Sequence, residues 1–368
     1  GEVIQRPASA VKELLENAVD AGSTAIKLII KDAGRTLIQV IDDGVGMSEE
    51  DAKMCFIRHA TSKISNAEDL FKISSKGFRG EALSSIAAVS HIELKTKTEK
   101  KEIGIKIIIE GSETKNTEAI ATKKGTSFSM KNLFYNIPAR RNFLKSNAVE
   151  TKHIIDEFQR VALAHPEIQF SMHSNEHIVF DLPISNRRQR IVNIMGKKFN
   201  ERLVPIEQET TISNISGFVL KPEFSKRTRG EQFLFVNNRF IKNSSINYAI
   251  NQAFKDLISK DQFPSYYIYL EVPTESIDIN IHPTKTEIKF DDERAIYAIV
   301  QSCIKNSLGK YNVSPTLDFE QETSFNVPPI SDATKVYEPQ IKVDPYYNPF
   351  KPNVNQKNIE ENIHFLRD

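Results

Sequence analysis

This sequence of 368 residues has very few cysteines and no long hydrophobic run, and both features limit what the protein can be. Only Cys55 and Cys303 occur, far apart and without metal-ligand spacing. This excludes a disulfide framework and favours a reducing compartment, which we expect to be the cytoplasm. No apolar run approaches the roughly 20 residues that a helix needs to cross a bilayer, and no signal peptide is present. We therefore expect no membrane partner.

A large excess of charge is also missing, because 49 Lys and Arg residues are balanced by 48 Asp and Glu residues, for a net charge of +1. A generally basic surface is thereby excluded, and any contact with DNA depends on local patches. Internal repeats are absent as well. The first residue is Gly1 rather than methionine, from which we expect a fragment.

The hydrophobic pattern divides the chain into two α/β units and a tail. In residues 1–185, strands and amphipathic helices predict one sheet backed by helices. The polar, basic stretch at 183–190 marks a boundary, and residues 186–311 form a smaller α/β unit. From residue 312 on, Pro, Asn and charged residues predominate without periodicity, so 312–368 is predicted to be a disordered linker.

Strands and helices are expected from period-2 and period-3.6 patterns and from turn residues. The expected strands are 24–32, 36–43, 90–98, 104–111, 117–123, 125–133, about 212–222 and 231–237, 266–272 and 276–283. The expected helices are about 11–20, with Pro7 and Ser9 ahead of it as start signals, 47–56, 81–89, 150–165, 187–195, 244–259 and 293–310.

The helix expected near 11–20 has two unlike faces. One is an apolar stripe that we expect to be buried, formed by Val11, Leu14, Leu15 and Ala18. The other is a polar column, formed by Glu13, Glu16, Asn17 and Asp20. Taken alone, such a column is more often solvated surface. Beside a phosphate site, however, a Glu can deprotonate water and an Asn can ligate Mg²⁺.

The stretch DDGVGM places Asp42 at the end of an expected strand, with Gly44 and Gly46 just beyond it. The two glycines permit a close backbone approach, although a tight turn is the plainer interpretation. Neither a Rossmann fingerprint nor a P-loop is present. A carboxylate at a strand end can accept a hydrogen bond from the amino group of adenine.

A glycine-rich basic loop, SKGFRGEALSS, runs directly into a helix near residue 81. Exposed amides and a helix N-terminus form an anion site, although a basic surface loop has about equal weight. The flexible stretch RHATSKI lies upstream, at 58–64. Because glycines flank residues 47–80, this interval is predicted to move as a lid.

The order of four motifs resembles that of the GHKL ATPases, which include the ATPase subunit of DNA gyrase, heat-shock chaperones, sensor histidine kinases and MutL proteins. The motifs are E-x-x-x-N-x-x-D-A at 13–21, D-x-G-x-G at 42–46, G-F-R-G-E-A-L at 77–83 and G-T at 125–126. Longer stretches resemble the MutL family of DNA mismatch repair proteins over about residues 1–310: RPASAVKELLENAVDAG, RHATSKI, GFRGEALSSI, LFYNIPARRNFLK and DINIHPTKTEIKF.

The resemblance implies a GHKL (Bergerat) ATPase sandwich, an α/β (α+β) fold, followed by a smaller transducer-type domain. It implies that Glu13 is the general base, that Asn17 binds Mg²⁺, and that Asp42 with Thr126 reads adenine. Lys285 in the second domain is implied to reach the γ-phosphate of ATP. The remaining ATP-binding residues implied are Gly44, Gly46, Thr61, Ser62, Lys63, Gly77, Phe78, Arg79, Gly80 and Glu81.

The resemblance also implies partners: a homodimer that forms on ATP, the mismatch-recognition protein MutS, DNA, and a strand-incision endonuclease or a helicase. The DNA-contacting candidates are Arg140, Arg141, Lys145, Arg239 and Lys242. A further basic cluster, Arg187, Arg188 and Arg190, is another candidate for a surface patch, although any single cluster is more often solvated surface. Ser244 stands where some relatives have a basic residue.

Two alternatives share the nucleotide fold. A sensor histidine kinase should have a phosphoacceptor helix upstream and no second domain with a lysine such as Lys285. A type II topoisomerase ATPase subunit should continue into a folded metal-binding cleavage domain rather than into a segment rich in Pro and Asn. The sequence favours mismatch repair over both.

Overall fold

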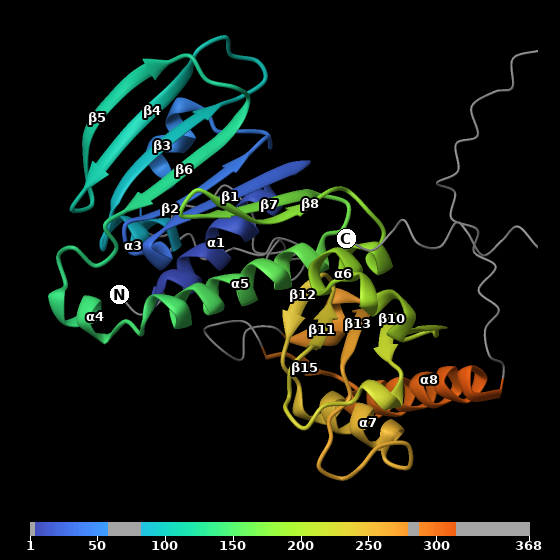
Figure 1. Ribbon diagram of the computed structural model, residues 1–368. Coiled ribbons are helices and arrows are strands. Elements are labelled where there is room, and N and C mark those ends of the chain that lie inside the picture. The colour runs from blue at the N-terminus through green and yellow to red at the C-terminus, as the bar shows by residue number, and fades with distance from the viewer. Residues whose placement is uncertain (1–3, 58–81, 279–286, 314–368) are drawn as a thin grey trace, which may run out of the picture. The chain divides into compact units, whose positions relative to one another are not determined.

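The structure is a computed structural model that describes residues 4–57, 82–278 and 287–313 (Figure 1). Its first part is an eight-stranded sheet in the order β5-β4-β3-β6-β2-β1-β7-β8. All neighbouring strands are antiparallel except β1 and β7, which are parallel. The strands are β1 (Ala25–Lys31), β2 (Leu37–Asp42), β3 (His91–Lys97), β4 (Gly104–Glu110), β5 (Glu113–Ile120), β6 (Gly125–Lys131), β7 (Gln169–Ser174) and β8 (His177–Leu182).

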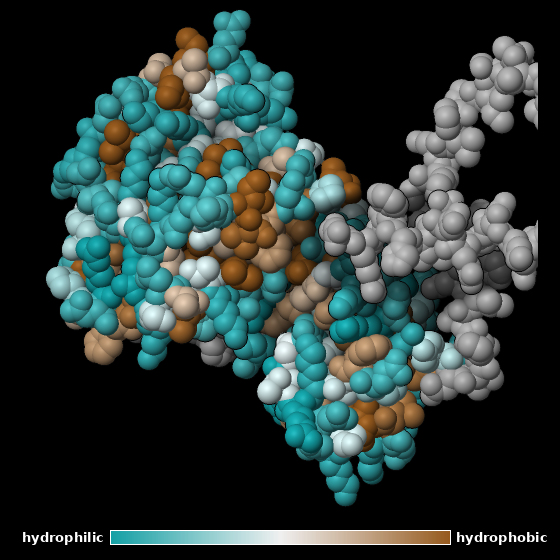
Figure 2. All heavy atoms as spheres, viewed as in Figure 1, coloured by the Kyte–Doolittle hydropathy of each residue, from teal (hydrophilic) through white to brown (hydrophobic). Residues whose placement is uncertain are grey.

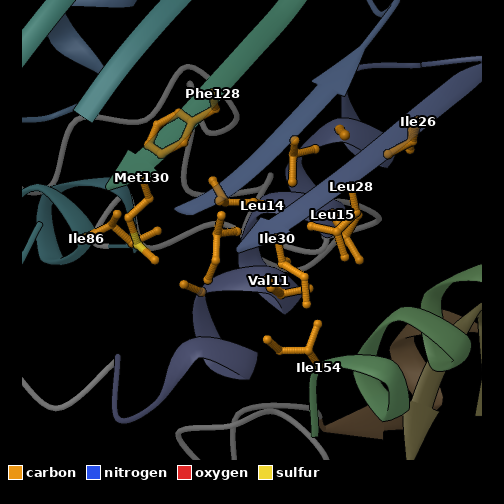
Figure 3. Close-up of a cluster of buried hydrophobic side chains, with 14 of the residues drawn as sticks. Val11, Leu14, Leu15, Ile26, Leu28, Ile30, Ile86, Phe128, Met130 and Ile154 are labelled. Atoms are coloured by element: carbon orange, nitrogen blue, oxygen red, sulfur yellow. The ribbon is translucent and has the colours of Figure 1, made fainter. Parts of the chain in front are cut away.

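Helices pack on one face of this sheet, as the sequence predicts. The buried side chains of α1 point at those of β1, and Ile86, Met130 and Ile154 extend the same cluster (Figure 3). The strands alternate buried and half-buried residues, so within the described ranges the helices cover one face of the sheet and leave the other partly accessible. The helices of this part are α1 (Pro7–Asp20), α2 (Glu49–Met54), α3 (Ala82–Ala87), α4 (Pro138–Phe143) and α5 (Asn147–Ala164), with a 3₁₀ turn η1 (Asp32–Gly34).

A five-stranded sheet, in the order β12-β11-β13-β10-β9, forms the second part. Its strands are β9 (Leu203–Glu209), β10 (Asn214–Leu220), β11 (Gln232–Val236), β12 (Arg239–Ile241) and β13 (Tyr266–Glu271). The other elements are the helices α6 (Arg187–Met195), α7 (Ser244–Phe254) and α8 (Glu293–Val313), the strand pair β14 (Ile277–Asp278) and β15 (Lys289–Phe290), and the 3₁₀ turns η3 (Lys197–Arg202), η4 (Pro222–Phe224) and η5 (Thr274–Ser276).

Both faces of the second sheet are buried. Leu234 and Ile268 belong to a core with α7 and α8, whereas Phe235 and Tyr269 belong to a cluster with the end of α5 and with α6. The Tyr269 hydroxyl donates a hydrogen bond of 2.9 Å to the Leu163 carbonyl in that cluster. Alternate residues of β11 and β13 therefore serve two different cores.

Several predicted elements need correction. Ser9 lies inside α1, where Pro7 is the first residue and Arg6 the cap without a side-chain hydrogen bond. The sequence does not predict strands β7, β8, β9, β12 and β15 or helix α4. Strand β5 begins at Glu113 rather than at 117, and α7 ends at Phe254 rather than at 259. Ser48 caps α2 as its position suggests, since its hydroxyl accepts from the Asp51 amide at 3.1 Å.

Arg190 differs most clearly from what the sequence predicts. The basic run at 187–190 predicts a surface patch, whereas Arg190 is fully buried. Its guanidinium donates to carbonyl groups at the end of α5 and in the segments that flank β7 and β8. The acceptors are Ala162 (2.9 Å), His165 (3.5 Å), Pro166 (3.0 Å), Ile168 (2.7 Å) and Pro183 (3.0 Å). Burial lowers the pKa of Arg190 to about 10, which leaves the side chain charged at neutral pH.

Candidate nucleotide-binding site

Asp42 ends β2 on the face of the first sheet that the helices cover. Ile38 and Val40 are buried on that face, and alternation along the strand puts Asp42 on the same side. The register pairs Asp42 with Thr126, the second residue of β6. The carboxylate and the Thr126 side chain therefore lie next to each other, as the adenine-reading hypothesis requires.

The last turn of α1 lies beside Asp42. The Val45 amide donates to the Ala21 carbonyl at 3.0 Å, which joins the loop after β2 to the end of the helix. The Ser23 hydroxyl donates to the Ala18 carbonyl at 2.6 Å and lies 3.3 Å from Asp42 Oδ1. These contacts connect the helix that carries Glu13 and Asn17 to the strand end that carries Asp42.

Burial dominates the electrostatics of the Asp42 carboxyl group. It raises the pKa of Asp42 to about 6, although the Gly44 amide, which donates to Oδ1 at 3.0 Å, and Ser23 favour the charged form. The neighbouring Asp43 behaves oppositely. Its pKa is lowered, because hydrogen bonds from Thr24 and from the Ala25 amide outweigh its slight burial. Asp42 is thus the poorly solvated carboxylate of the pair.

Both glycines of the D-x-G-x-G motif are required by close packing. A Cβ atom on Gly44 would lie 2.7 Å from the Ala21 carbonyl oxygen. Gly46 has φ +68, and a Cβ atom there would lie 2.1 Å from the Lys97 carbonyl oxygen. The loop after β2 can therefore lie between the end of α1 and β3 only without side chains at these positions.

Thr96 supports this loop and was not singled out from the sequence. Its buried hydroxyl donates to the Gly125 carbonyl at 3.0 Å, accepts from the Met47 amide at 2.9 Å and lies 3.1 Å from Thr126 Oγ1. The sequence does contain an indication of this role. Thr96 follows Ile92 and Leu94 at the inward positions of an expected strand, where a buried hydroxyl group needs hydrogen-bond partners.

The predicted polar column on α1 is divided. Glu13 and Asn17 are both half-buried, one helical turn apart. Glu16 instead lines a small hollow with Glu157 and Arg160 of α5. Glu16 therefore belongs to the contact between the two helices.

Nine of the predicted site residues lie outside the described part of the chain. They are Thr61, Ser62, Lys63, Gly77, Phe78, Arg79, Gly80, Glu81 and Lys285. Most of the predicted lid, from residue 58 to residue 80, lies there as well.

A hollow of about 270 Å³ opens at the end of the first sheet that carries Asp42, and Asp42 and Thr126 are among its lining residues. The lining also includes Lys27, Ile41 and Ser171, which alternate with the buried residues of their strands and therefore lie on the face opposite α1. Glu13 and Asn17 do not line this hollow.

The DNA-contacting candidates fall on two elements. On α4 and just after it, Arg141 and Lys145 are exposed, whereas Arg140 is half-buried and donates to the Ile4 carbonyl at 3.4 Å. On β12 and just after it, Arg239 is half-buried and Lys242 is exposed. Ser244 begins α7, which Asn243 caps by accepting from the Ile246 amide at 2.8 Å.

The described residues contain neither a membrane-spanning helix nor a cluster of metal ligands. No helix among them is long and apolar enough to span a bilayer. No group of three or more His, Cys, Asp and Glu residues among them is arranged to hold a metal ion.

Family models match both parts of the chain. The model of histidine kinase-, DNA gyrase B- and HSP90-like ATPases matches residues 5–137, and that of the C-terminal domain of DNA mismatch repair proteins matches residues 191–309. The second match disfavours the kinase and topoisomerase alternatives, because it covers the sheet and helices that follow the nucleotide fold.

Curated relatives match nearly the whole chain. The DNA mismatch repair protein MutL of Christiangramia forsetii is 60% identical over 357 residues, which are 97% of this chain and 58% of that protein. MutL of Bacteroides fragilis is 50% identical over 353 residues, which are 96% of this chain and 56% of that protein. The chain thus spans a little over half the length of these relatives.

Solved structures agree in fold. The Aquifex aeolicus MutL ATPase domain complexed with ADP is 26% identical, with a TM-score of 0.57, and the match covers 74% of this chain and 93% of that domain. The N-terminal domain of a DNA repair protein has a TM-score of 0.74 at 24% identity and covers 86% of this chain and 98% of that domain. The chain therefore belongs to the MutL family of DNA mismatch repair proteins, and its first part is a GHKL-type ATPase domain.

Proposed function

We propose that this chain binds ATP between α1 and the ends of β2 and β6 and hydrolyses it in DNA mismatch repair. The observation that carries the proposal is the Asp42 carboxylate, half-buried beside the helix that bears Glu13 and Asn17. A poorly solvated carboxylate gains most from a donor such as the amino group of adenine. The Aquifex aeolicus MutL ATPase domain, which is complexed with ADP, supports the binding of an adenine nucleotide by this fold.

Each side chain then has a role in the reaction. Glu13 accepts a proton from the attacking water, and Lys285 contacts the γ-phosphate from the second part of the chain. Asn17 offers an amide oxygen to Mg²⁺, which takes one or two protein ligands beside phosphate oxygens and water, so a single ligand on α1 fits this ion. When bound, Mg²⁺ neutralises phosphate charge. The eight lid and loop candidates between Thr61 and Glu81 would hold the phosphates.

The wider proposal concerns the whole protein. We propose an ATPase domain at 1–185, a transducer-type domain at 186–311 and a linker at 312–368. We further propose cytoplasmic action as a homodimer that forms on ATP and that contacts MutS, DNA and a downstream endonuclease or helicase. The names of the relatives support mismatch repair, and the two basic elements α4 and β12 support contact with DNA phosphates.

Asp42→Asn should weaken the binding of ATP about 10- to 100-fold, the range expected when a hydrogen bond to a charged group is lost. The wild type should prefer ATP to GTP, because guanine has a carbonyl group where adenine has its amino group, and the variant should lose most of that preference. Calorimetry at pH 8 measures both affinities. Asp43→Asn is the matched control, since the Asp43 carboxylate is occupied by Thr24 and Ala25.

The same group predicts a pH dependence. A protonated Asp42 carboxyl group is neutral and accepts from adenine more weakly than the carboxylate, so the ratio of wild-type to Asp42→Asn affinity should fall as the pH is lowered through about 6. Taking this ratio removes the titration of the phosphates of ATP, which both proteins experience equally. Equal affinities of the two proteins for ATP at pH 8 would contradict the adenine-reading role.

Asp42→Asn should also stabilise the nucleotide-free protein at pH 8. The pKa of Asp42 in the folded protein is above its ordinary value of 3.8. The folded state therefore binds this proton more tightly than the unfolded chain, and the charged group lowers the free energy of unfolding above pH 6 but not below about pH 4. We expect a gain of about 1–3 kcal/mol in urea unfolding at pH 8 that vanishes at pH 4. A loss of stability at pH 8 would mean that Asp42 is a structural carboxylate.

A further inference from the structure

Phe143 is the most exposed large hydrophobic residue that the described part of the chain contains, with 84% of its surface accessible. It is the last residue of α4, a helix with no buried residue. Most of the face in Figure 2 is hydrophilic, with hydrophobic side chains in small separate groups. A single exposed hydrophobic residue is common on protein surfaces, so the surroundings of this ring decide what it can bind.

Polar contacts fix the chain on both sides of this ring. After α4, the Lys145 amide donates to Glu150 Oε1 at 2.9 Å, and the Lys145 carbonyl accepts from the Arg35 guanidinium. Glu150 is fully buried. Before the ring, Arg140 donates to the Ile4 carbonyl and its guanidinium lies 5.8 Å from the centre of the Phe134 ring. The fold therefore holds this segment in place and leaves the Phe143 ring in solvent.

The surroundings of Phe143 are basic. Arg141 and Lys145 are both exposed, two residues before and two residues after the ring. No Asp or Glu occurs from residue 119 to residue 149. A single aromatic ring between cations is a poor core for a protein–protein contact, which needs a buried apolar centre. The combination instead matches the two requirements of single-stranded nucleic acid, namely a ring on which a base stacks and cations for the phosphates.

We propose that Phe143 is a stacking platform for an unpaired base, and that α4 with Lys145 binds single-stranded DNA. The inference rests on the proposed contact with DNA and adds the aromatic residue that takes up a base and its place on α4. Arg141 and Lys145 bind flanking phosphates, whereas the face of the Phe143 ring takes up a base. A duplex offers the phosphates but keeps its bases stacked, so it uses the cations alone.

The absence of tryptophan from this chain allows a direct test. Phe143→Trp introduces one indole ring at the proposed platform, and a stacked base should quench its fluorescence. Oligo(dT) of about 20 nucleotides, longer than the roughly 4–16 nucleotides of common single-strand sites, is the probe. An abasic oligomer of equal length carries the same phosphates and should bind without quenching. Ile178→Trp, at a position with 66% exposure on β8, is the matched control and should respond to neither oligomer.

Affinities complete the test. By fluorescence anisotropy with labelled oligomers, Phe143→Ala should weaken oligo(dT) binding roughly tenfold and change duplex binding less than about twofold, whereas Phe143→Tyr should keep wild-type affinity. Binding of both DNA forms should weaken with salt, because both use phosphates.

The outcomes separate the inference from the proposal on which it rests. If the wild type binds neither oligo(dT) nor duplex at low salt, the proposed DNA contact fails. If the wild type binds DNA while the indole fluorescence of the Phe143→Trp variant stays unchanged and Phe143→Ala binds normally, only the stacking inference fails. An indole signal that follows protein concentration without DNA would assign Phe143 to a contact between two copies of the chain and would also overturn the inference.

Discussion

Glu13→Ala should lower the rate of ATP hydrolysis roughly 10²-fold or more while ATP affinity stays within a few-fold of wild type. Glu13 shares a helix with Asn17, and the end of that helix is joined to the loop after Asp42. A general base acts mainly in the transition state, so its loss lowers turnover rather than binding. Steady-state hydrolysis and calorimetry with a non-hydrolysable analogue measure the two quantities separately.

Glu16→Ala is the matched control for this experiment. It removes the same side chain from the same helix, but Glu16 lines the hollow between α1 and α5. Its rate of ATP hydrolysis, measured without DNA, should stay within about twofold of wild type, since Glu16 lies outside the proposed base and metal positions. Equal losses in both variants would mean that the charge of α1, rather than a base at Glu13, determines the rate.

Arg190→Leu should reduce the free energy of unfolding by about 3–5 kcal/mol, since several buried carbonyl groups lose their donor at a cost of roughly 1–3 kcal/mol each. Leucine leaves several buried carbonyl groups without a donor, including those of Ala162, Ile168 and Pro183. Arg190→Lys should restore only part of the loss, because an ammonium group cannot reach acceptors in several directions as the guanidinium does.

Urea unfolding measures this cost, with Arg188→Leu as the control. Arg188 is half-buried, two residues away on α6, and donates to the Asn200 side chain and carbonyl, both at 2.8 Å. Its replacement should cost about 1 kcal/mol, as for one or two partly solvated hydrogen bonds. If the Arg190 and Arg188 variants lose the same stability, the buried guanidinium is not the stabilising element proposed here.

Local patterns in the sequence predict much of the site. Apolar residues at helical spacing identify the buried face of α1, where Val11, Leu14, Leu15 and Ala18 are all buried. Alternation in β1 and β2 identifies the inward face and hence the position of Asp42 at its end. These inferences hold because each depends on a repeat that a single element contains.

Other features depend on contacts between distant segments, and no local pattern contains them. Strand β5 has no buried residue, and β8 buries only Leu182, so neither shows the alternation that identifies a strand. Arg190 has the composition of a surface residue, and its acceptors lie up to 28 residues away along the chain. The separation of Glu16 from Glu13 and Asn17 on α1 likewise depends on α5. Only the packing of the two helices brings Glu16 and Arg160 to the same hollow.

A crystal structure of this chain with Mg²⁺ and a non-hydrolysable ATP analogue tests the central claim most directly. We expect the adenine amino group within hydrogen-bond distance of the Asp42 carboxylate, with the phosphates on the side of the sheet that α1 covers and the Asn17 amide oxygen bound to the metal ion. A nucleotide whose phosphates lie on the face of the sheet opposite α1, beside Lys27 and Ser171, would contradict the proposed site. So would a nucleotide whose base does not contact Asp42.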